Sequence, residues 1–332
     1  MIVKINIFNK EVKIMKKILL PLVATLLLAP SAYAKTLNLG HAMSLESAAH
    51  QGMVIMAEKV KEKSDGDLTI KIFPNGQLGS ERDQAEQVVT GAIDMAKING
   101  GLAESFEPTF KVNALPFLFR DVPHMRKFMR SEAAQEMLVS SEGKGFIGLT
   151  FYDSGTRSFY AKKAINSPAD LAGMKVRVPG SPTMMEMVNL LGGKATPVPF
   201  NEVYTALQQG VIDGAENNIS SLVEMKHSEV AKFYSMDQHM MTPDVIIISE
   251  NKWNSLTSAE QKILKEAAAE SLEEQIKIWD ATDNMNKAKG IKEGVTFIEV
   301  DKAPFRAAVK PMIDEAKKDP KLAHFIDKIE AL

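Results

Sequence analysis

Two segments of the chain follow the same short pattern and end in polar side chains. Residues 86–100 read EQVVTGAIDMAKING, and residues 202–218 read EVYTALQQGVIDGAENN. In each segment a helical stretch stops at a glycine, an apolar stretch follows, and amide side chains such as Asn99 and Asn217 come last. Ligands of open parallel sheets bind beyond the carboxyl ends of the strands, so we expect both amides to face one cleft. The alternative, that they only cap the next helix or turn, stays open.

Two arginines have the right chemistry for an anionic ligand. Arg177 lies in the alternating stretch 174–178, MKVRV, two residues before Pro179. The apolar residues share one face of the expected strand, so the arginine lies on the other face and can project past the sheet edge. Its planar guanidinium can bind a carboxylate through two parallel hydrogen bonds. Arg157, in residues 155–160 (GTRSFY), is a second candidate for binding a carboxylate. On spacing alone, either arginine could instead be an ordinary surface residue or part of a salt bridge.

Four further residues are candidates with an equally simple structural explanation. Phe200 opens the helix of the second segment, where an aromatic ring could line a ligand or pack in the core. Glu81 opens the helix of the first segment, where a carboxylate often only complements the helix N-terminus. His41 and His50 lie near the end of the first expected strand and along the first expected helix. These histidines could reach the same cleft, or they could have packing or surface roles.

Enzyme signatures fail on inspection. The G-x-G-x-x-G match at residues 143–148 leads into a strand, whereas a dinucleotide site needs it to open a helix. Two S-x-x-K matches have no companion motif. The chain has no cysteine, which excludes disulfides, thiolate metal sites and a cysteine nucleophile, and its six histidines have no metal-binding spacing. We therefore expect no cofactor, no metal and no catalytic residue.

The N-terminus has the pattern of a secretory signal peptide. Two lysines precede the apolar run 18–29, and Ala-Tyr-Ala at residues 32–34 gives a small-residue cleavage site. Residues 1–34 are therefore expected to be removed, with 15–34 as the true signal and an exported product. The remaining chain has 35 basic and 41 acidic residues, a net charge of −6. This balance argues against nucleic acid as a partner.

The remaining residues, about 298 of them, suggest two α/β domains. Expected strands alternate with helices in two units of similar pattern, which favours mostly parallel sheets flanked by helices. The expected strands cover residues 36–40, 68–73, 92–98, 146–151, 156–161, 174–178, 195–198, 211–215 and 245–249. The expected helices cover residues 46–63, 80–90, 183–191 and 202–209, and a long one opens with a capping box at 257–260 and continues to about 289.

Three runs of residues resemble a known family, the substrate-binding proteins of TRAP (tripartite ATP-independent periplasmic) transporters. They are QLGSERDQAEQVVTGAIDMA at 77–96, DLAGMKVRVPG at 170–180 and FNEVYTALQQGVIDGAEN at 200–217. The resemblance implies a two-lobed periplasmic binding protein fold, type II-like, that closes on its ligand like a hinge, with a long helix bracing both lobes. Lobe I would comprise residues 35–154 and about 244–282. Lobe II would comprise residues 155–243 and about 283–332.

The resemblance also implies roles for the candidate residues. Arg177 matches the arginine that binds the substrate carboxylate, and Arg157 matches a second arginine that assists it. Asn217 matches an asparagine that contacts the ligand, and Phe200 an aromatic residue that lines the pocket. The loaded protein, expected to be a monomer, would dock on a membrane permease of two subunits driven by an ion gradient.

The substrate class follows less directly. Sialic-acid binders of the family carry a glutamate where this chain has Asn99, which argues against sialic acid. The motif runs look more like members that take sugar acids, especially hexuronates such as glucuronate or galacturonate. Glu81, Asn99, His41 and His50 would then meet hydroxyl groups. A C4-dicarboxylate stays open within the family, and a periplasmic sugar-acid hydrolase or lyase, or an adhesion or scaffold protein, outside it.

Overall fold

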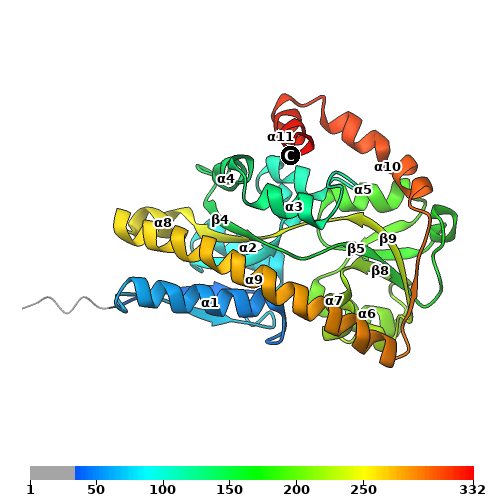
Figure 1. The fold of residues 1–332 in the computed structure, drawn as a ribbon, viewed down its shortest axis with the longest axis horizontal. Coiled ribbons are helices and arrows are strands. Elements are labelled where there is room, and N and C mark those ends of the chain that lie inside the picture. The colour runs from blue at the N-terminus through cyan, green and yellow to red at the C-terminus, as the bar shows by residue number, and fades with distance from the viewer. Residues whose placement is uncertain (1–33) are drawn as a thin grey trace, which may run out of the picture. The chain divides into compact units, whose positions relative to one another are not determined.

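The chain folds into two β-sheets, each with helices packed around it (Figure 1). A computed structural model describes residues 34–332, of which 35–332 form one compact unit. The expected signal peptide therefore lies, apart from its last residue, outside the described residues. Within the described part of the chain, no helix has the length and apolar character needed to cross a membrane.

The first sheet has five strands in the order β2-β1-β3-β10-β4. The first three are parallel, and β10 runs antiparallel to both β3 and β4. The strands are β1 (Lys35–Gly40), β2 (Leu68–Phe73), β3 (Met95–Asn99), β4 (Phe146–Tyr152) and β10 (Asp244–Ser249). The late strand β10 thus inserts between two early strands, so the chain crosses from this sheet to the second one and returns.

The second sheet has six strands in the order β11-β9-β5-β8-β6-β7. Strand β8 lies at its centre, parallel to β6 and antiparallel to β5. The strands are β5 (Arg157–Ala161), β6 (Lys175–Val178), β7 (Lys194–Pro197), β8 (Gly214–Asn217), β9 (Phe233–Met240) and β11 (Thr296–Ile298). Each sheet is therefore mixed, with its parallel strands next to the returning antiparallel ones.

Helices surround the sheets, and short 3₁₀ turns join several of the elements. The α-helices are α1 (Ala48–Lys63), α2 (Glu81–Thr90), α3 (Val122–Met129), α4 (Glu132–Val139), α5 (Pro182–Leu190), α6 (Val203–Gln209), α7 (Ile219–Glu224), α8 (Glu250–Ser255), α9 (Ser258–Lys292), α10 (Ala303–Ala316) and α11 (Pro320–Glu330). The 3₁₀ turns are η1 (Leu102–Ser105), η2 (Pro108–Ala114), η3 (Pro168–Leu171), η4 (Phe200–Glu202) and η5 (His227–Glu229).

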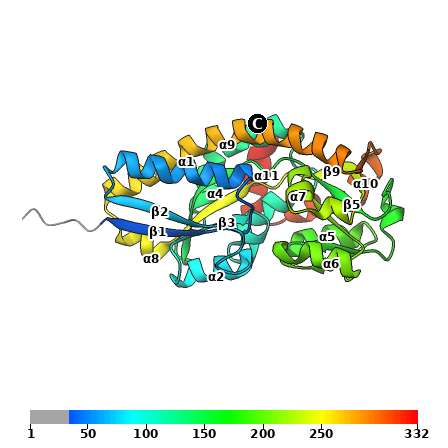
Figure 2. The same ribbon diagram turned by 90° about the horizontal axis from the view of Figure 1, so that it is seen from below.

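The long helix α9 spans 35 residues and packs on elements of both sheets, as expected (Figure 2). Its start is fixed by a capping box between Thr257 and Glu260. Toward its N-terminal end it runs along α1, where Glu270 pairs with two lysines of that helix. Toward its C-terminal end Asn286 donates to Ser220 and Glu224 of α7. A continuous helix that contacts both halves provides the brace that the sequence predicted.

The glycines of the two repeated segments end their helices in the same way. Gly91 and Gly210 have φ angles of 79° and 72°, in the left-handed region that favours glycine. The next residue donates its N–H to the carbonyl oxygen five residues earlier, at 2.8 Å for Ala92 and 2.9 Å for Val211. This is the Schellman arrangement, which satisfies carbonyls left over at a helix end.

These turns correct the expected strand boundaries. Strands β3 and β8 begin only at the fourth residue after each glycine, so the expected starts at 92 and 211 were wrong. The intervening residues complete the turn, and Val211 is exposed. Strand β8 also extends further than expected: Glu216 and Asn217 belong to it and are buried, so they do not follow the strand at the lobe edge.

The aspartate of each repeat fastens its segment to a neighbouring strand. Asp94 Oδ2 accepts a hydrogen bond from the backbone N–H of Asn38 at 2.8 Å. Asp213 Oδ2 accepts one from the backbone N–H of Lys175 at the same distance. The repeated Gly-x-Ile-Asp pattern therefore aligns parallel strands in both sheets.

The strands divide between the sheets on the expected sides of the lobe boundaries. Helix α11, which we expected in lobe II, lies beside α3 and α4, which accompany the first sheet (Figure 1). His124 Nε2 contacts the carbonyl oxygen of Ile329 at 2.8 Å, and Glu136 pairs with Lys328 of α11. The chain's end thus returns to the first sheet, while the complete division into lobes stays a prediction.

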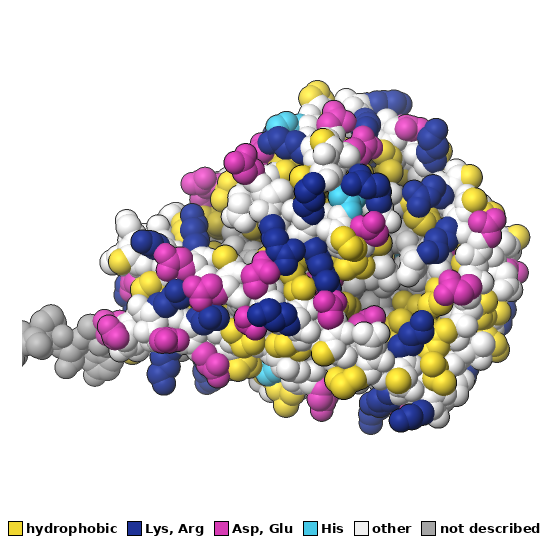
Figure 3. Space-filling view, viewed as in Figure 1, with side chains coloured by type: hydrophobic (Ala, Val, Ile, Leu, Met, Phe, Trp, Pro, Cys, Tyr) yellow, Lys and Arg dark blue, Asp and Glu magenta, His cyan; other side chains and the backbone are white. Residues whose placement is uncertain are grey.

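Charges of both signs are interspersed over the face that carries α9 (Figure 3). Several form pairs along or between helices, such as Lys59 with Glu270 and Lys277 with Glu274. A nucleic-acid surface would need basic residues gathered on one face. The face in view has no such gathering, and the expectation drawn from net charge stays a prediction.

Candidate functional site

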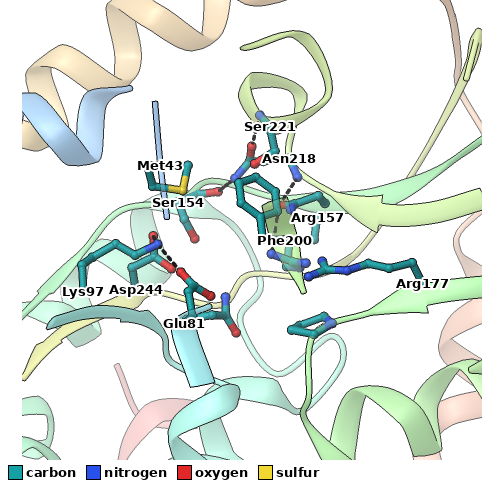
Figure 4. A pocket seen from close by; sticks show the side chains of 13 residues that line it. Met43, Glu81, Lys97, Ser154, Arg157, Arg177, Phe200, Asn218, Ser221 and Asp244 are labelled. Atoms are coloured by element: carbon teal, nitrogen blue, oxygen red, sulfur yellow. Dashed lines mark hydrogen bonds and ion pairs between the residues drawn. The ribbon is translucent and has the colours of Figure 1, made fainter. Parts of the chain in front are cut away.

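A pocket lies where strand ends of the two sheets meet, and the space between its lining atoms, with the open mouth included, is about 370 Å³ (Figure 4). It contains six of the eight residues that the sequence singled out. The lining residues are Met43, Glu81, Lys97, Asn99, Ser154, Arg157, Arg177, Pro179, Phe200, Asn217, Asn218, Ser221 and Asp244. Residues from β3, β10 and α2 form one wall, and residues from β5, β6 and β8 form the other.

The strand order of the second sheet brings the two arginines together. Strand β8 lies between β5 and β6. The register pairs Ser158 with Asn217 and Arg177 with Ala215, so both arginines flank the end of β8. Residues that are 20 positions apart in the sequence therefore enter one pocket, and only the sheet topology reveals it.

Arg157 is held by a carboxylate of its own sheet. Its Nε and one terminal nitrogen each donate to Glu216 at 2.7 Å, one to each carboxylate oxygen. The other terminal nitrogen donates to Asn217 Oδ1 at 2.9 Å. Both partners of the pair are buried. Burial raises the pKa of Glu216, but the Arg157 charge outweighs this effect and holds that pKa at about 2.

A second buried pair lies behind Glu216. His239 contacts Asp237 through Nδ1 at 2.7 Å and Glu216 through Nε2 at 3.4 Å. Burial lowers the pKa of His239, but the Asp237 charge and the hydrogen bonds to both carboxylates raise it to about 9. Two cations and two carboxylates thus form a balanced buried chain, so Arg157 brings no excess charge to the pocket.

Arg177 is buried without such a partner. Its Nε donates to the carbonyl oxygen of Val198 at 2.8 Å, and its guanidinium carbon lies 5.8 Å from the centre of the Phe200 ring. Among the described residues, no carboxylate lies within salt-bridge distance and its terminal nitrogens have no hydrogen-bond acceptor. Burial, together with the nearby Arg157 charge, lowers the pKa of Arg177. A buried guanidinium with unused donors that lines a pocket has the chemistry to bind an anion.

The opposite wall carries a group with an excess of negative charge. Lys97 Nζ lies 2.9 Å from Glu81 and 2.9 Å from Asp244, and Figure 4 shows the three together across from the arginines. Burial lowers the pKa of Lys97, but the two carboxylates outweigh this effect and raise it. Burial, together with the nearby Glu81 charge, raises the pKa of Asp244. With both carboxylates ionised, the single cation Lys97 leaves this wall one negative charge in excess, and the carboxylates keep free acceptor lone pairs.

The asparagines combine the two roles that the sequence left open. Asn99 Oδ1 accepts from the backbone N–H of Gly101 at 3.0 Å, and Asn217 Oδ1 accepts from the backbone N–H of Asn218 at 2.9 Å. Both side chains also line the pocket. Neither Nδ2 donates to a described protein group, so both amides keep donors for a ligand. The helix cap in the second segment is Asn218, whose Oδ1 accepts from the N–H of Ser221.

His41 and His50 lie outside the pocket lining. His41 Nδ1 accepts from the backbone N–H of Met43 at 3.1 Å, so in the neutral ring the proton is on Nε2. That nitrogen lies 3.0 Å from His50 Nδ1. Burial, helped by the Lys97 charge, lowers the pKa of His41 to about 3. The pair holds the backbone beside Met43, and a direct contact of either histidine with ligand remains a prediction.

Sequence reasoning assigned no site role to Lys97, Glu216 or Asp244. A signal for the first two was present: they occupy the same position of the repeated segment, the third residue of β3 and of β8. A lysine and a glutamate at equivalent positions of two buried strands each need a partner of opposite charge, so the repeat could have indicated one ion-paired group in each sheet. Asp244 gave no comparable signal, because only its pairing opposite Asn99 at the start of β10 brings it to the pocket.

The family model for bacterial extracellular solute-binding proteins of family 7 matches residues 39–319. The chain belongs to this family. A solved TRAP periplasmic solute-binding protein from Xanthobacter autotrophicus, with bound β-D-galacturonate, is 41% identical, covers 89% of this chain and 99% of its own, and has a TM-score of 0.87. One from Anaerococcus prevotii, with bound α/β-D-glucuronate, is 38% identical, with coverage of 90% and 97% and a TM-score of 0.87.

A curated relative agrees over most of the chain. The protein YiiZ of Salmonella typhimurium (strain LT2) is 38% identical over 278 residues, 83% of this chain and 85% of its own length. The resemblance to TRAP substrate-binding proteins and the two-lobed fold expected from it are thus confirmed. The pocket between the two sheets, lined by Arg177, is therefore the candidate solute site.

Proposed function

We propose that this family 7 protein captures a hexuronate-type sugar acid outside the cytoplasm and delivers it to the membrane permease of a TRAP transporter. The observation that carries the proposal is the opposite charge of the two pocket walls. The wall with Arg177 offers unused guanidinium donors, and the wall with Glu81 and Asp244 offers carboxylate acceptors. A monocarboxylate that carries hydroxyl groups meets both demands.

The ligand carboxylate belongs at Arg177. There it would accept two charge-assisted hydrogen bonds from a guanidinium that is already desolvated. The side-chain amides of Asn99 and Asn217 offer further donors. At the far wall, hydroxyl groups would donate to Glu81 and Asp244, whose remaining lone pairs Lys97 does not use. A ligand that lacks such hydroxyl donors would leave acceptor positions of these carboxylates unused in a poorly hydrated pocket, which would disfavour that ligand.

The same charges disfavour a C4-dicarboxylate. If one carboxylate binds Arg177, the second must approach Glu81 and Asp244 or compete for Arg157. Arg157 is already bound to Glu216 through two hydrogen bonds. Like charges in a poorly hydrated pocket repel strongly, so a second carboxylate carries a large cost. The bound sugar acids of the two similar TRAP proteins support the hexuronate assignment.

A calorimetric comparison tests the assignment. Residues 35–332 are titrated with D-glucuronate, D-galacturonate, succinate, L-malate and N-acetylneuraminate. We expect tight binding of at least one hexuronate and binding of the dicarboxylates that is at least about 100-fold weaker, a difference of about 2.7 kcal/mol. Tight binding of succinate or malate with none of either hexuronate would overturn the substrate class. Chromatography of the bound acid after long incubation addresses the hydrolase or lyase alternative, since a receptor returns its ligand unchanged.

A further inference from the structure

A carboxylate beside the pocket links the two sheets. Glu104, in the 3₁₀ turn η1 directly after β3, reaches the first turn of α5, which follows β6 of the other sheet. Its Oε1 accepts from the backbone N–H of Thr183 at 3.0 Å, and its Oε2 accepts from Thr183 Oγ1 at 2.6 Å. Ser181 Oγ also donates to Oε1. Three donors of the second sheet's side therefore converge on one carboxylate of the first sheet's side.

The carboxylate completes the N-terminal cap of α5. Helix starts leave backbone N–H groups without partners. Pro182, the first residue of α5, has no N–H, and Ser181 Oγ accepts from the N–H of Met184. The N–H of Thr183 is the remaining donor of this first turn, and Glu104 supplies its acceptor. The partial positive charge of a helix N-terminus further favours a carboxylate there.

Apolar contacts accompany this cap. A Cβ atom at Gly101 would lie 2.9 Å from the methyl group of Met184, and one at Gly180 would lie 3.5 Å from Leu102. The two segments are therefore packed directly against each other around the Glu104 contact. Ser181 and Thr183 are almost fully buried, so water does not compete for their hydrogen bonds in this conformation.

Both segments of this contact begin at pocket residues. On one side Asn99 lines the pocket and Glu104 follows five residues later. On the other side Arg177 and Pro179 line the pocket, and Ser181 follows two residues after Pro179. A ligand held between Arg177 and Asn99 would therefore connect the two segments that carry the Glu104 contact. A separation of the two sheets at this point would part the carboxylate from the α5 donors.

We propose that Glu104 is a latch that holds the pocket closed over its ligand. It touches no ligand; it acts by capping α5 across the cleft only when the two sheets are closed, and so it slows ligand release. This inference rests on the proposed function, because it needs a ligand that closes the pocket. A latch of this kind changes the dissociation rate more than the association rate, since the contact forms after the encounter.

The test compares Glu104→Gln and Thr183→Val with wild type, using D-glucuronate as the probe and stopped-flow fluorescence as the readout. Hydrogen bonds to charged groups are the strong ones, so we expect dissociation to become about 10-fold faster in Glu104→Gln. The association rate should stay within about twofold of wild type. The double variant should release the ligand only slightly faster than Glu104→Gln alone, because both substitutions remove the same contact.

Asp170→Asn is the matched control. Asp170 also caps a helical turn, through the backbone N–H groups of Asn166 and Ser167, but its partners belong to the same segment. We expect this variant to lower the melting temperature of the ligand-free protein without changing ligand release. The Glu104 variants should do the reverse. An unchanged dissociation rate in Glu104→Gln would overturn the latch. So would a faster dissociation rate that is accompanied by a lower melting temperature of the ligand-free variant.

The two proposals fail in distinguishable ways. If wild type does not bind D-glucuronate but binds another acid of the calorimetric series, the substrate assignment is wrong, and that acid becomes the probe for the latch. If wild type binds D-glucuronate and the Glu104 variants release it at the wild-type rate, the substrate assignment stands and the latch is wrong.

Discussion

Arg157 is bound by Glu216 through two hydrogen bonds of 2.7 Å, whereas Arg177, two strands away in the same sheet, contacts no carboxylate among the described residues. The two arginines of the pocket are therefore not equivalent. The charge of Arg157 is neutralised by Glu216, so this residue contributes to the pocket wall without an unpaired charge. The charge of Arg177 is not paired with a carboxylate of the described residues, and we propose that it binds the ligand. This difference leads to separate predictions for the two residues.

Replacing Arg177 with lysine should weaken hexuronate binding by about 100-fold or more. An ammonium group cannot reproduce the two parallel hydrogen bonds of the guanidinium, and the shorter polar head leaves the Val198 carbonyl unpaired. Isothermal titration calorimetry with D-glucuronate measures the effect. Arg82→Lys, at an exposed pair with Glu86, is the control and should bind as wild type does. Equal affinities for Arg177→Lys and wild type would show that the carboxylate binds elsewhere.

Replacing Glu81 with glutamine should relax the selection against a second carboxylate. The variant leaves Lys97 with Asp244 as its single carboxylate, so the wall loses its excess negative charge. We expect D-glucuronate affinity to fall by roughly tenfold, because one charged hydrogen-bond acceptor is lost. The affinity of the variant for D-glucarate, the six-carbon diacid that corresponds to D-glucuronate, should rise relative to its affinity for D-glucuronate. An unchanged ratio of the two dissociation constants would contradict the role given to this wall.

Replacing Glu216 with glutamine should destabilise the protein strongly. Arg157 would remain buried without its compensating charge, and removal of one partner of a buried ion pair costs about 3–5 kcal/mol. Denaturant unfolding of the ligand-free protein gives the free energy of unfolding. Glu136→Gln removes a carboxylate from an exposed pair with Lys328 and should cost no more than about 1 kcal/mol. Similar losses in the two variants would argue against a buried Arg157 that depends on Glu216.

His239 should make the stability depend on pH between about 6.5 and 9. Its folded-state pKa of about 9 lies above the ordinary value of 6.5, so the folded protein binds the proton more tightly. The stabilisation is complete below pH 6.5 and is lost as the pH rises through 9. Such a shift corresponds to on the order of 3 kcal/mol.

Unfolding of wild type and His239→Gln, measured at pH 6 and pH 9.5, tests this prediction. The comparison with the variant removes contributions from other titrating groups, which include Asp237 on the same strand, β9, and Glu216 on β8. We expect the stability advantage of wild type to shrink at the higher pH. A constant difference between the two proteins would mean that His239 is not protonated in the folded state.

Much of the fold followed from local patterns in the sequence. Alternating apolar residues predicted most of the strands, and glycines and capping residues predicted where helices stop and start. Boundaries failed where a turn had to be completed first, as after Gly91 and Gly210. Several elements were not predicted from the sequence: β9, β11, α3, α4, α7, α8, α10 and α11.

The sequence by itself determined the family, the repeated segments and the chemistry available for a ligand, since motif identity and residue type are local properties. It identified six residues of the pocket, including Arg177 and Asn217. It could not decide which of the two arginines has a carboxylate partner. Glu216 was expected to follow strand β8, and Arg157, with which it pairs, lies 59 residues earlier in the chain. Strand order and register decide such pairings. The charge of each pocket wall is therefore decided only by the tertiary structure. The same holds for the contact of Glu104 with α5.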